Sequence, residues 1–145
     1  MAFRFSLATV LRYRDSVEKR EELALRKSLL DLARARQEVE RLTAEIAAAR
    51  DSQNKALQHT LSAFDLQRML DAIDAAIARR KVVVESLPAL ERKREACMKS
   101  YQTAHRDCQT LSEMRERQRD EFDQERARAE QKFLDDVFGA RAQRN

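Results

Sequence analysis

One short stretch, residues 59–65, is the only convincing break in an otherwise helix-forming sequence. Within it, Ser62 and Asp65 have the spacing of a capping box. In this motif the serine side chain caps the start of a helix, and the acidic side chain three residues later reaches back to the backbone of the serine. The polar residues 51–54 lower helix propensity just upstream. We therefore predict a turn over about 55–62 that joins two antiparallel helices with both chain ends at one pole. An extended turn that lets two chains pair is the alternative.

The scarcity of helix breakers supports this prediction. The chain has Gly 1 and Pro 1, while 37% of its 145 residues are charged. Sheets and multi-element enzyme folds need turns, and turns need glycine and proline. Disorder is the competing interpretation for so charged a chain, but the regular apolar spacing described next argues against it. The sequence predicts an all-α fold, an elongated antiparallel two-helix coiled coil that forms a helical hairpin over residues 1–145.

The first helix is expected over about residues 3–54. Apolar residues recur every seven positions, with a second set between them; the two sets are Leu25, Leu32, Val39 and Ile46, and Leu29, Ala35, Leu42 and Ala49. This spacing is typical of a coiled-coil seam. Phe3, Val10, Val17 and Ala24 follow a frame offset by one residue, so we expect the seam to drift. The basic start could lie on a membrane surface, but packing on a partner helix is the preferred interpretation.

The second helix is expected over about residues 63–138, with a frayed tail over 139–145. Its apolar face is broad at first and nearly vanishes after Met114, where a helix pair would be poorly sealed. The broad part consists of Leu66, Met69, Leu70, Ile73, Ile77, Val83, Val84, Leu87 and Leu90. Pro88 lies inside the pattern and predicts a kink or a brief interruption. Gly139 is expected to end the periodic region.

Charge and hydropathy bound the environment. The net charge of +4 comes from mixed signs along the chain, so nucleic-acid binding is not expected. No apolar run approaches the roughly 20 residues that cross a bilayer, and Arg4 interrupts what would be the core of a signal peptide. Cys97 and Cys108 would lie about 16 Å apart on one helix, too far to bridge. Reduced thiols in a cytoplasmic protein follow.

The sequence offers no convincing catalytic chemistry. His105 and Cys108 could supply two metal ligands, but a structural zinc site needs four. Asp71 with Asp74, or Asp135 with Asp136, could in principle act as paired carboxylates, yet two helices cannot easily build the dry pocket that catalysis needs. We therefore expect no enzyme, no catalytic residue, no cofactor and no metal site.

Three segments, at the start, the centre and the end of the pattern, have the same order as in one known family. They are residues 3–7, followed by Val10-Leu11, Arg14 and Glu18; residues 61–66, leading to Met69 and Ile73; and residues 130–136. Together they resemble the flagellar FliJ family, in its amino-terminal signature, the entry to its second helix and its closing segment. Asp136 stands where glutamate is usual, and Pro88 departs from the uninterrupted second helix of the family.

The resemblance implies a non-enzymatic component of the flagellar type III protein export apparatus. Members of this family form a rod similar to the stalk of rotary ATPases, bind the hexameric export ATPase, reach towards the export gate in the membrane and interact with export chaperones. A cytoplasmic protein, peripheral at the cytoplasmic face of the inner membrane, is implied. The alternative is a generic scaffolding coiled coil, a homodimer with no ATPase partner.

The resemblance also assigns two sets of partner-binding residues. Met69, Ile73, Ala76 and Arg80 would match the gate-binding strip, although Met69, Ile73 and Ala76 could equally be seam residues. The end that enters the ATPase ring would carry Phe3, Leu7, Phe133 and Phe138, because both ends of the pattern are expected to meet there.

Overall fold

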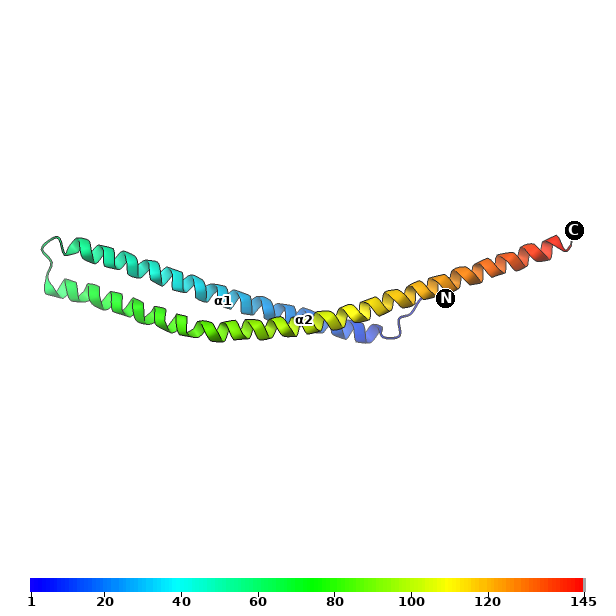
Figure 1. Ribbon diagram of the computed structural model, residues 1–145, viewed down its shortest axis with the longest axis horizontal. Helices are drawn as coiled ribbons and strands as arrows, with labels where there is room; N and C mark the ends of the chain where they lie inside the picture. Colours follow the sequence, from blue (N-terminus) through cyan, green and yellow to red (C-terminus); the bar gives the residue numbers. More distant parts are fainter. Residues whose placement is uncertain (145) are drawn as a thin grey trace. The chain divides into compact units, whose positions relative to one another are not determined.

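The computed structural model describes residues 1–144. Helix α1 spans Ala8–Ala56 and helix α2 spans Ala63–Ala142, and the described residues contain no strand. The two helices pack against each other as a helical hairpin (Figure 1). The predicted all-α hairpin is confirmed. Within the described residues, neither helix has a stretch with the length and hydrophobicity needed to span a bilayer.

The turn has the cap that the sequence predicts. The Ser62 hydroxyl oxygen accepts a hydrogen bond from the Asp65 backbone N–H at 3.1 Å and donates one to the Asp65 carboxylate at 2.7 Å. At the other side of the turn, the N–H groups of Gln58 and His59 donate to the carbonyls of Lys55 and Ala56. These short-range bonds satisfy carbonyls that α1 would otherwise leave open. The chain therefore reverses here without any glycine or proline.

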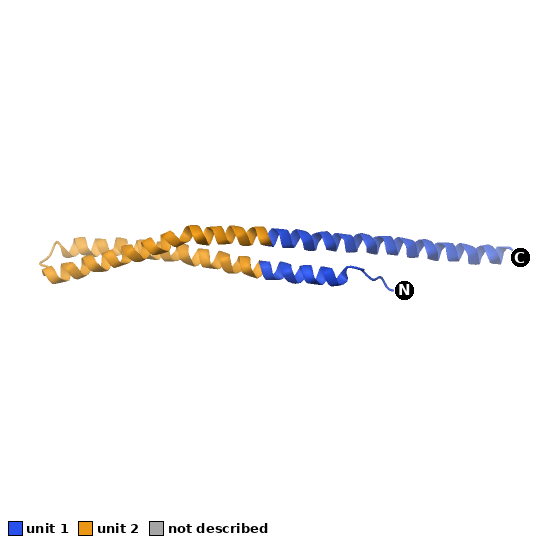
Figure 2. Ribbon diagram, turned by 90° about the horizontal axis from the view of Figure 1, so that it is seen from below, with its two compact units in different colours: residues 1–21, 101–145 blue, residues 22–100 orange. Residues whose placement is uncertain are grey.

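The chain divides into two compact units (Figure 2): unit 1 is residues 1–21 and 101–144, and unit 2 is residues 22–100. In unit 2 the helices run antiparallel, because Arg36 bridges to Glu91 while Glu45, further along α1, bridges to Arg79, earlier on α2. The buried core of unit 2 consists of Leu25, Leu32, Leu42, Ile46, Ile73 and Ala76.

The seam of α1 in unit 2 differs from the prediction at one position. Leu29 is 41% exposed, and Ser28 is 2% exposed in its place. The inward residues are Leu25, Ser28, Leu32, Ala35, Val39, Leu42, Ile46 and Ala49. They alternate steps of three and four, the spacing that keeps one stripe facing a partner helix. Leu29 breaks that alternation, so geometry places the smaller, polar Ser28 inside.

Pro88 does not interrupt α2, which is continuous from Ala63 to Ala142. Of the two predicted effects, the brief interruption is wrong, and the kink stays a prediction. Pro88 is exposed, so its ring lies on the outer side of the helix pair. The neighbouring Ser86 hydroxyl donates to the Val83 carbonyl at 2.6 Å, which occupies one backbone acceptor in this turn.

In unit 1 the helix starts later than the expected residue 3. Residues 1–5 have no regular secondary structure, and α1 begins at Ala8. Phe5 is 9% exposed, and the Phe3 ring packs on Phe122 with ring centroids 5.7 Å apart. Residues two apart point to the same side of an extended segment but to nearly opposite sides of a helix. Leaving the helix therefore lets the Phe3 ring reach α2 while the Phe5 side chain is also buried.

The predicted offset frame is only partly seen in unit 1. Val10 is 43% exposed, whereas Val17 of the same frame is half-buried. The half-buried residues Leu11, Arg14, Glu18 and Glu21 continue steps of three and four into Leu25. Ala104 and Cys108 of α2 are buried in the same unit. The seam of unit 1 is therefore largely polar on its α1 side.

Helix α2 also ends later than expected. It runs to Ala142, beyond Gly139, and Gln143 N–H donates to the Gly139 carbonyl at 3.2 Å. No described glycine has a positive φ, so Gly139 does not act as a left-handed helix cap. Arg141 suits the last turn because a positive charge is favourable near the negative end of the helix dipole.

Candidate partner-binding surfaces

The last part of α2 in unit 1 has no helix packed on it among the described residues (Figure 2). From residue 123 to residue 144 every side chain is exposed except Val137, which is half-buried. Met1 reaches only as far as a shallow hollow that it shares with Phe122, Glu125, Arg126 and Ala129. The helix beyond Ala129 is therefore an unpaired extension.

An apolar stripe lies on this extension. Its members, which we call the C-terminal stripe, are Phe133, Leu134, Val137 and Phe138. Phe133 and Val137, like Leu134 and Phe138, are four residues apart, so the four side chains gather on one helix face. Phe133 is 67% and Phe138 is 63% exposed. Large apolar side chains grouped in solvent mark a surface for another protein.

The four residues expected at the ATPase end do not form one cluster. Phe3 and Leu7 are half-buried, and Phe3 packs on Phe122. Phe133 lies eleven residues further along α2, which corresponds to about 16 Å of helix. The expectation that both ends of the pattern meet at Phe133 and Phe138 is therefore wrong. Phe3 serves packing within unit 1, whereas Phe133 and Phe138 face solvent.

The residues expected to bind the export gate lie on α2 in unit 2. Ile73 is 6% and Ala76 is 2% exposed, while Met69 and Arg80 are half-buried. All four occupy inward positions with steps of four, three and four. Ile73 and Ala76 therefore pack in the seam, as the alternative interpretation has it. Gate binding stays a prediction for the strip, with Met69 and Arg80 as its accessible ends.

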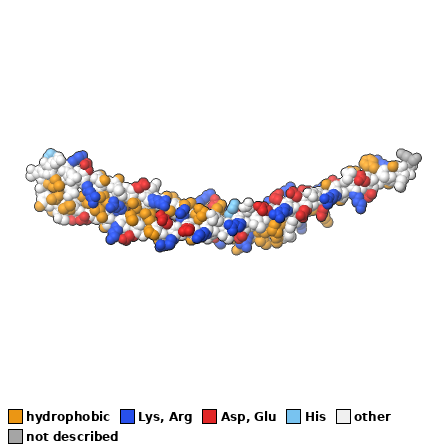
Figure 3. Space-filling model, viewed as in Figure 1, with side chains coloured by type: hydrophobic (Ala, Val, Ile, Leu, Met, Phe, Trp, Pro, Cys, Tyr) orange, Lys and Arg blue, Asp and Glu red, His pale blue; other side chains and the backbone are white. Residues whose placement is uncertain are grey.

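Sequence reasoning did not single out an apolar hollow in unit 2. It is lined by Glu38, Leu42, Ala78, Arg79, Val82 and Val83. Val82 is 67% exposed beside it. Hydrophobic side chains and both signs of charge are interspersed on the visible face of the molecule (Figure 3). The run of three valines at 82–84 could have indicated this hollow. A seam with steps of three and four does not bury three consecutive residues, so some of these valines must face solvent.

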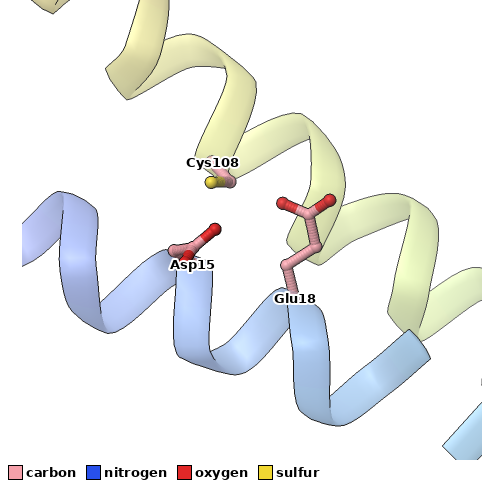
Figure 4. Close-up of side chains that lie close together, drawn as sticks. All are labelled: Asp15, Glu18 and Cys108. Atoms are coloured by element: carbon pink, nitrogen blue, oxygen red, sulfur yellow. The ribbon is translucent and has the colours of Figure 1, made fainter. Parts of the chain in front are cut away.

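A polar cluster joins α1 and α2 inside unit 1. Asp15 and Glu18 of α1 point toward Cys108 of α2 (Figure 4), and one ligand atom from each lies within 4.8 Å of the others. His105 Nδ1 is 2.9 Å from Glu18 Oε1, and Lys19 Nζ is 3.0 Å from Asp15 Oδ2. Nearby, Arg14 bridges to Asp107 at 3.3 Å. Both helices therefore supply titratable groups to one point of the seam.

Within the cluster, the pKa values of Glu18 and Cys108 shift in opposite directions. The hydrogen bond to His105 holds the pKa of the Glu18 carboxyl below its ordinary value. Burial raises the pKa of the Cys108 thiol, and the Glu18 carboxylate raises it further. Cys97 and Cys108 are both free thiols. At neutral pH the Cys108 thiol therefore keeps its proton beside two carboxylates.

The whole chain was compared with known protein families, curated proteins and solved structures. The family described as "Flagellar FliJ protein" has a model that matches residues 3–145, essentially the whole chain. A search of curated proteins and a search of solved structures gave no match.

Proposed function

This chain belongs to the flagellar FliJ family and is a component of the flagellar protein export apparatus, and from that premise we propose that it binds the hexameric export ATPase as a stalk. The C-terminal stripe is the contact that enters the ring. The observation that carries this proposal is the exposure of Phe133 and Phe138 on a helix that nothing else in unit 1 covers. Aromatic side chains, phenylalanine included, bury large apolar areas and contribute strongly to the binding energy of protein interfaces.

The mixed charge of the helices suits a stalk. Exposed ion pairs such as Arg41 with Glu38 and Glu45 satisfy charges within one helix. Charges at the rim of an interface mainly tune encounter and specificity. The ring is then held chiefly through apolar contacts at one end. The family is non-enzymatic, so ATP hydrolysis takes place in the ring alone.

Coupling to the export gate is the second part of the proposal. The gate contacts the strip of Met69, Ile73, Ala76 and Arg80 in unit 2. Because Ile73 and Ala76 are buried, the gate meets Met69 and Arg80 first. Export chaperones bind other exposed surfaces, and the protein is held at the cytoplasmic face of the inner membrane through these partners.

A binding measurement with the purified export ATPase tests the first part. We expect the wild-type chain to bind the ATPase and to promote hexamer assembly. The double variant Phe133→Ala/Phe138→Ala should bind about 30-fold more weakly, because a loss of about 1 kcal/mol at each truncated side chain corresponds to that factor. The matched control Val82→Ala/Val84→Ala removes two exposed apolar side chains elsewhere on α2 and should bind normally.

Two results would contradict the proposal. The first is equal binding by the stripe variant and the wild type. The second is no binding at low salt together with a tight homodimer in sedimentation experiments, which would support the alternative of a scaffolding coiled coil. Binding of an Arg80→Glu variant to the gate protein tests the second part separately, with Arg92→Glu as the control at an exposed position of α2.

A further inference from the structure

The C-terminal stripe has one acidic and one basic residue on its own helix face. Glu130 lies one turn before the stripe and Arg141 one turn after it. Each is three and four positions from the nearest members of the stripe, so it shares their face. Both are exposed. Glu130 pairs with Arg126 at 3.3 Å on the same helix, and exposed pairs of this kind hold a side chain only weakly. The face therefore runs from an acidic end through four apolar side chains to a basic end.

This order is complementary to itself when two such helices run antiparallel. In a pair centred between residues 135 and 136, each phenylalanine of the C-terminal stripe lies opposite the other phenylalanine of the second copy. The same register sets Leu134 opposite Val137 of the second copy, and Glu130 opposite Arg141 of the second copy. Parallel pairing in register sets Glu130 opposite Glu130 and Arg141 opposite Arg141, and like charges across an interface are unfavourable. The charges therefore select the antiparallel orientation.

The unpaired length of α2 matches the overlap of such a pair. The hollow that Met1 shares with α2 ends at Ala129, and α2 ends at Ala142. In the antiparallel register Ala129 lies opposite Ala142 of the second copy, which gives an overlap of about 20 Å. The second helix therefore covers the unpaired extension and stops at the hollow that Met1 occupies.

We propose that a second copy of this chain covers the C-terminal stripe, in an antiparallel pair of α2 extensions. The apolar side chains of both stripes leave water, and Glu130 of each copy contacts Arg141 of the other. The interface is smaller than those of stable dimers, so the pair separates on dilution. Pairing and ring binding exclude each other, a consequence that rests on the proposed function, because both use the same stripe. The free chain thus keeps its stripe covered until the ring takes it.

Sedimentation of the purified full-length chain without the ATPase tests the pairing by itself. We expect a monomer–dimer equilibrium with a dissociation constant on the order of 10 µM, at the weak end for protein interfaces. Phe133→Ala/Phe138→Ala should remain monomeric at concentrations where the wild type dimerises. The control Val82→Ala/Val84→Ala, which truncates exposed side chains elsewhere on α2, should dimerise like the wild type. Circular dichroism checks that each variant keeps its helix content.

Exchange of the two charges tests the orientation. In the antiparallel pair Glu130→Arg and Arg141→Glu each replace two attractive contacts by two repulsive ones, so each should weaken dimerisation at least about tenfold. The chain that carries both exchanges regains opposite charges and should dimerise within about threefold of the wild type. Lys132→Glu is the control, because Lys132 is exposed and two residues from both Glu130 and Leu134, on the other side of the helix.

A chain that stays monomeric at high concentration, or single exchanges that leave dimerisation unchanged as parallel pairing requires, would overturn the proposal. Sedimentation with the purified export ATPase added then tests the exclusion, and the dimer fraction should fall as the ring binds single copies. Dimers that persist on a ring that binds the chain would overturn the exclusion. A dimer that forms as expected while no ATPase binds would support the pairing and contradict the proposed function.

Discussion

Glu18 is a charged side chain in a seam position, and its carboxylate is stabilised by a residue of the other helix. Its side chain is 21% exposed and accepts a hydrogen bond from His105 at 2.9 Å when Nδ1 carries the proton. The neighbouring groups are Asp15 on its own helix and Cys108 on α2. A charge in this position is acceptable because His105 and Cys108 of α2 hydrogen-bond to it, whereas Asp15 is a like charge that opposes it.

The lowered pKa of Glu18 makes stability depend on pH. Because its pKa is lower in the folded than in the unfolded state, its contribution to the free energy of unfolding is complete above pH 4.5 and is lost as the pH falls through the folded pKa. Chemical unfolding measured across this pH range should show this loss in the wild type and a smaller one in Glu18→Gln. Glu22→Gln, which pairs only with Arg26 on α1, is the control; equal acid sensitivity of Glu18→Gln and the wild type would contradict the assignment.

Ser28 is a buried polar residue without a partner. It is 2% exposed, and among the described residues its hydroxyl makes no hydrogen bond. Replacing it by alanine removes that unsatisfied group and improves helix propensity, so Ser28→Ala should raise the free energy of unfolding by about 1 kcal/mol. Chemical denaturation measures the change. Ser16→Ala, at an exposed position of the same helix, should change it by less than about 0.5 kcal/mol, and a destabilised Ser28→Ala would contradict the interpretation.

Residue patterns predicted the cap at Ser62 and Asp65, because that interaction is local. They did not predict that Ser28 is buried and Leu29 exposed. Hydrophobicity favours leucine at a buried position, but the alternation of steps along the helices decides which residue faces the partner helix. The cluster around Cys108 was also out of reach. Its carboxylates lie on α1, far from Cys108 in sequence, and the register that brings them together depends on the whole hairpin.

At the scale of the element, α2 includes a proline without an interruption. Pro88 lacks the N–H that would donate to the carbonyl of Val84, and its ring crowds that turn. Pro88→Ala should therefore raise the free energy of unfolding, by up to about 3 kcal/mol. Denaturation with Lys93→Ala as an exposed control measures this. Destabilisation by Pro88→Ala would contradict this prediction and show that Pro88 stabilises the folded chain.

The extent of each element was only partly predictable. The fading apolar pattern after Met114 indicated a poorly sealed end, and the structure has an unpaired extension there. The start of α1 was missed because helix propensity alone favours helix over residues 3–7, whereas packing of Phe3 on Phe122 favours a non-helical segment. Tertiary contacts override local propensity at such ends.

At the scale of the whole molecule, the fold follows from one reversal between two long helices. That result was predictable because a chain with Gly 1 and Pro 1 has few places to turn, and one of them has a helix cap. The partners were not predictable from this pattern, since any helical hairpin shares it. The proposed partners rest on family membership and on the stripe that the hairpin leaves exposed.

The most direct measurement is site-specific photo-crosslinking to the assembled export ATPase. A photoreactive amino acid replaces Phe138, in the C-terminal stripe, or His59, in the turn of unit 2. We expect a covalent adduct with the ATPase from position 138 and none from position 59. An adduct from position 59 alone, or none from either position while the complex forms, would contradict binding through the C-terminal stripe.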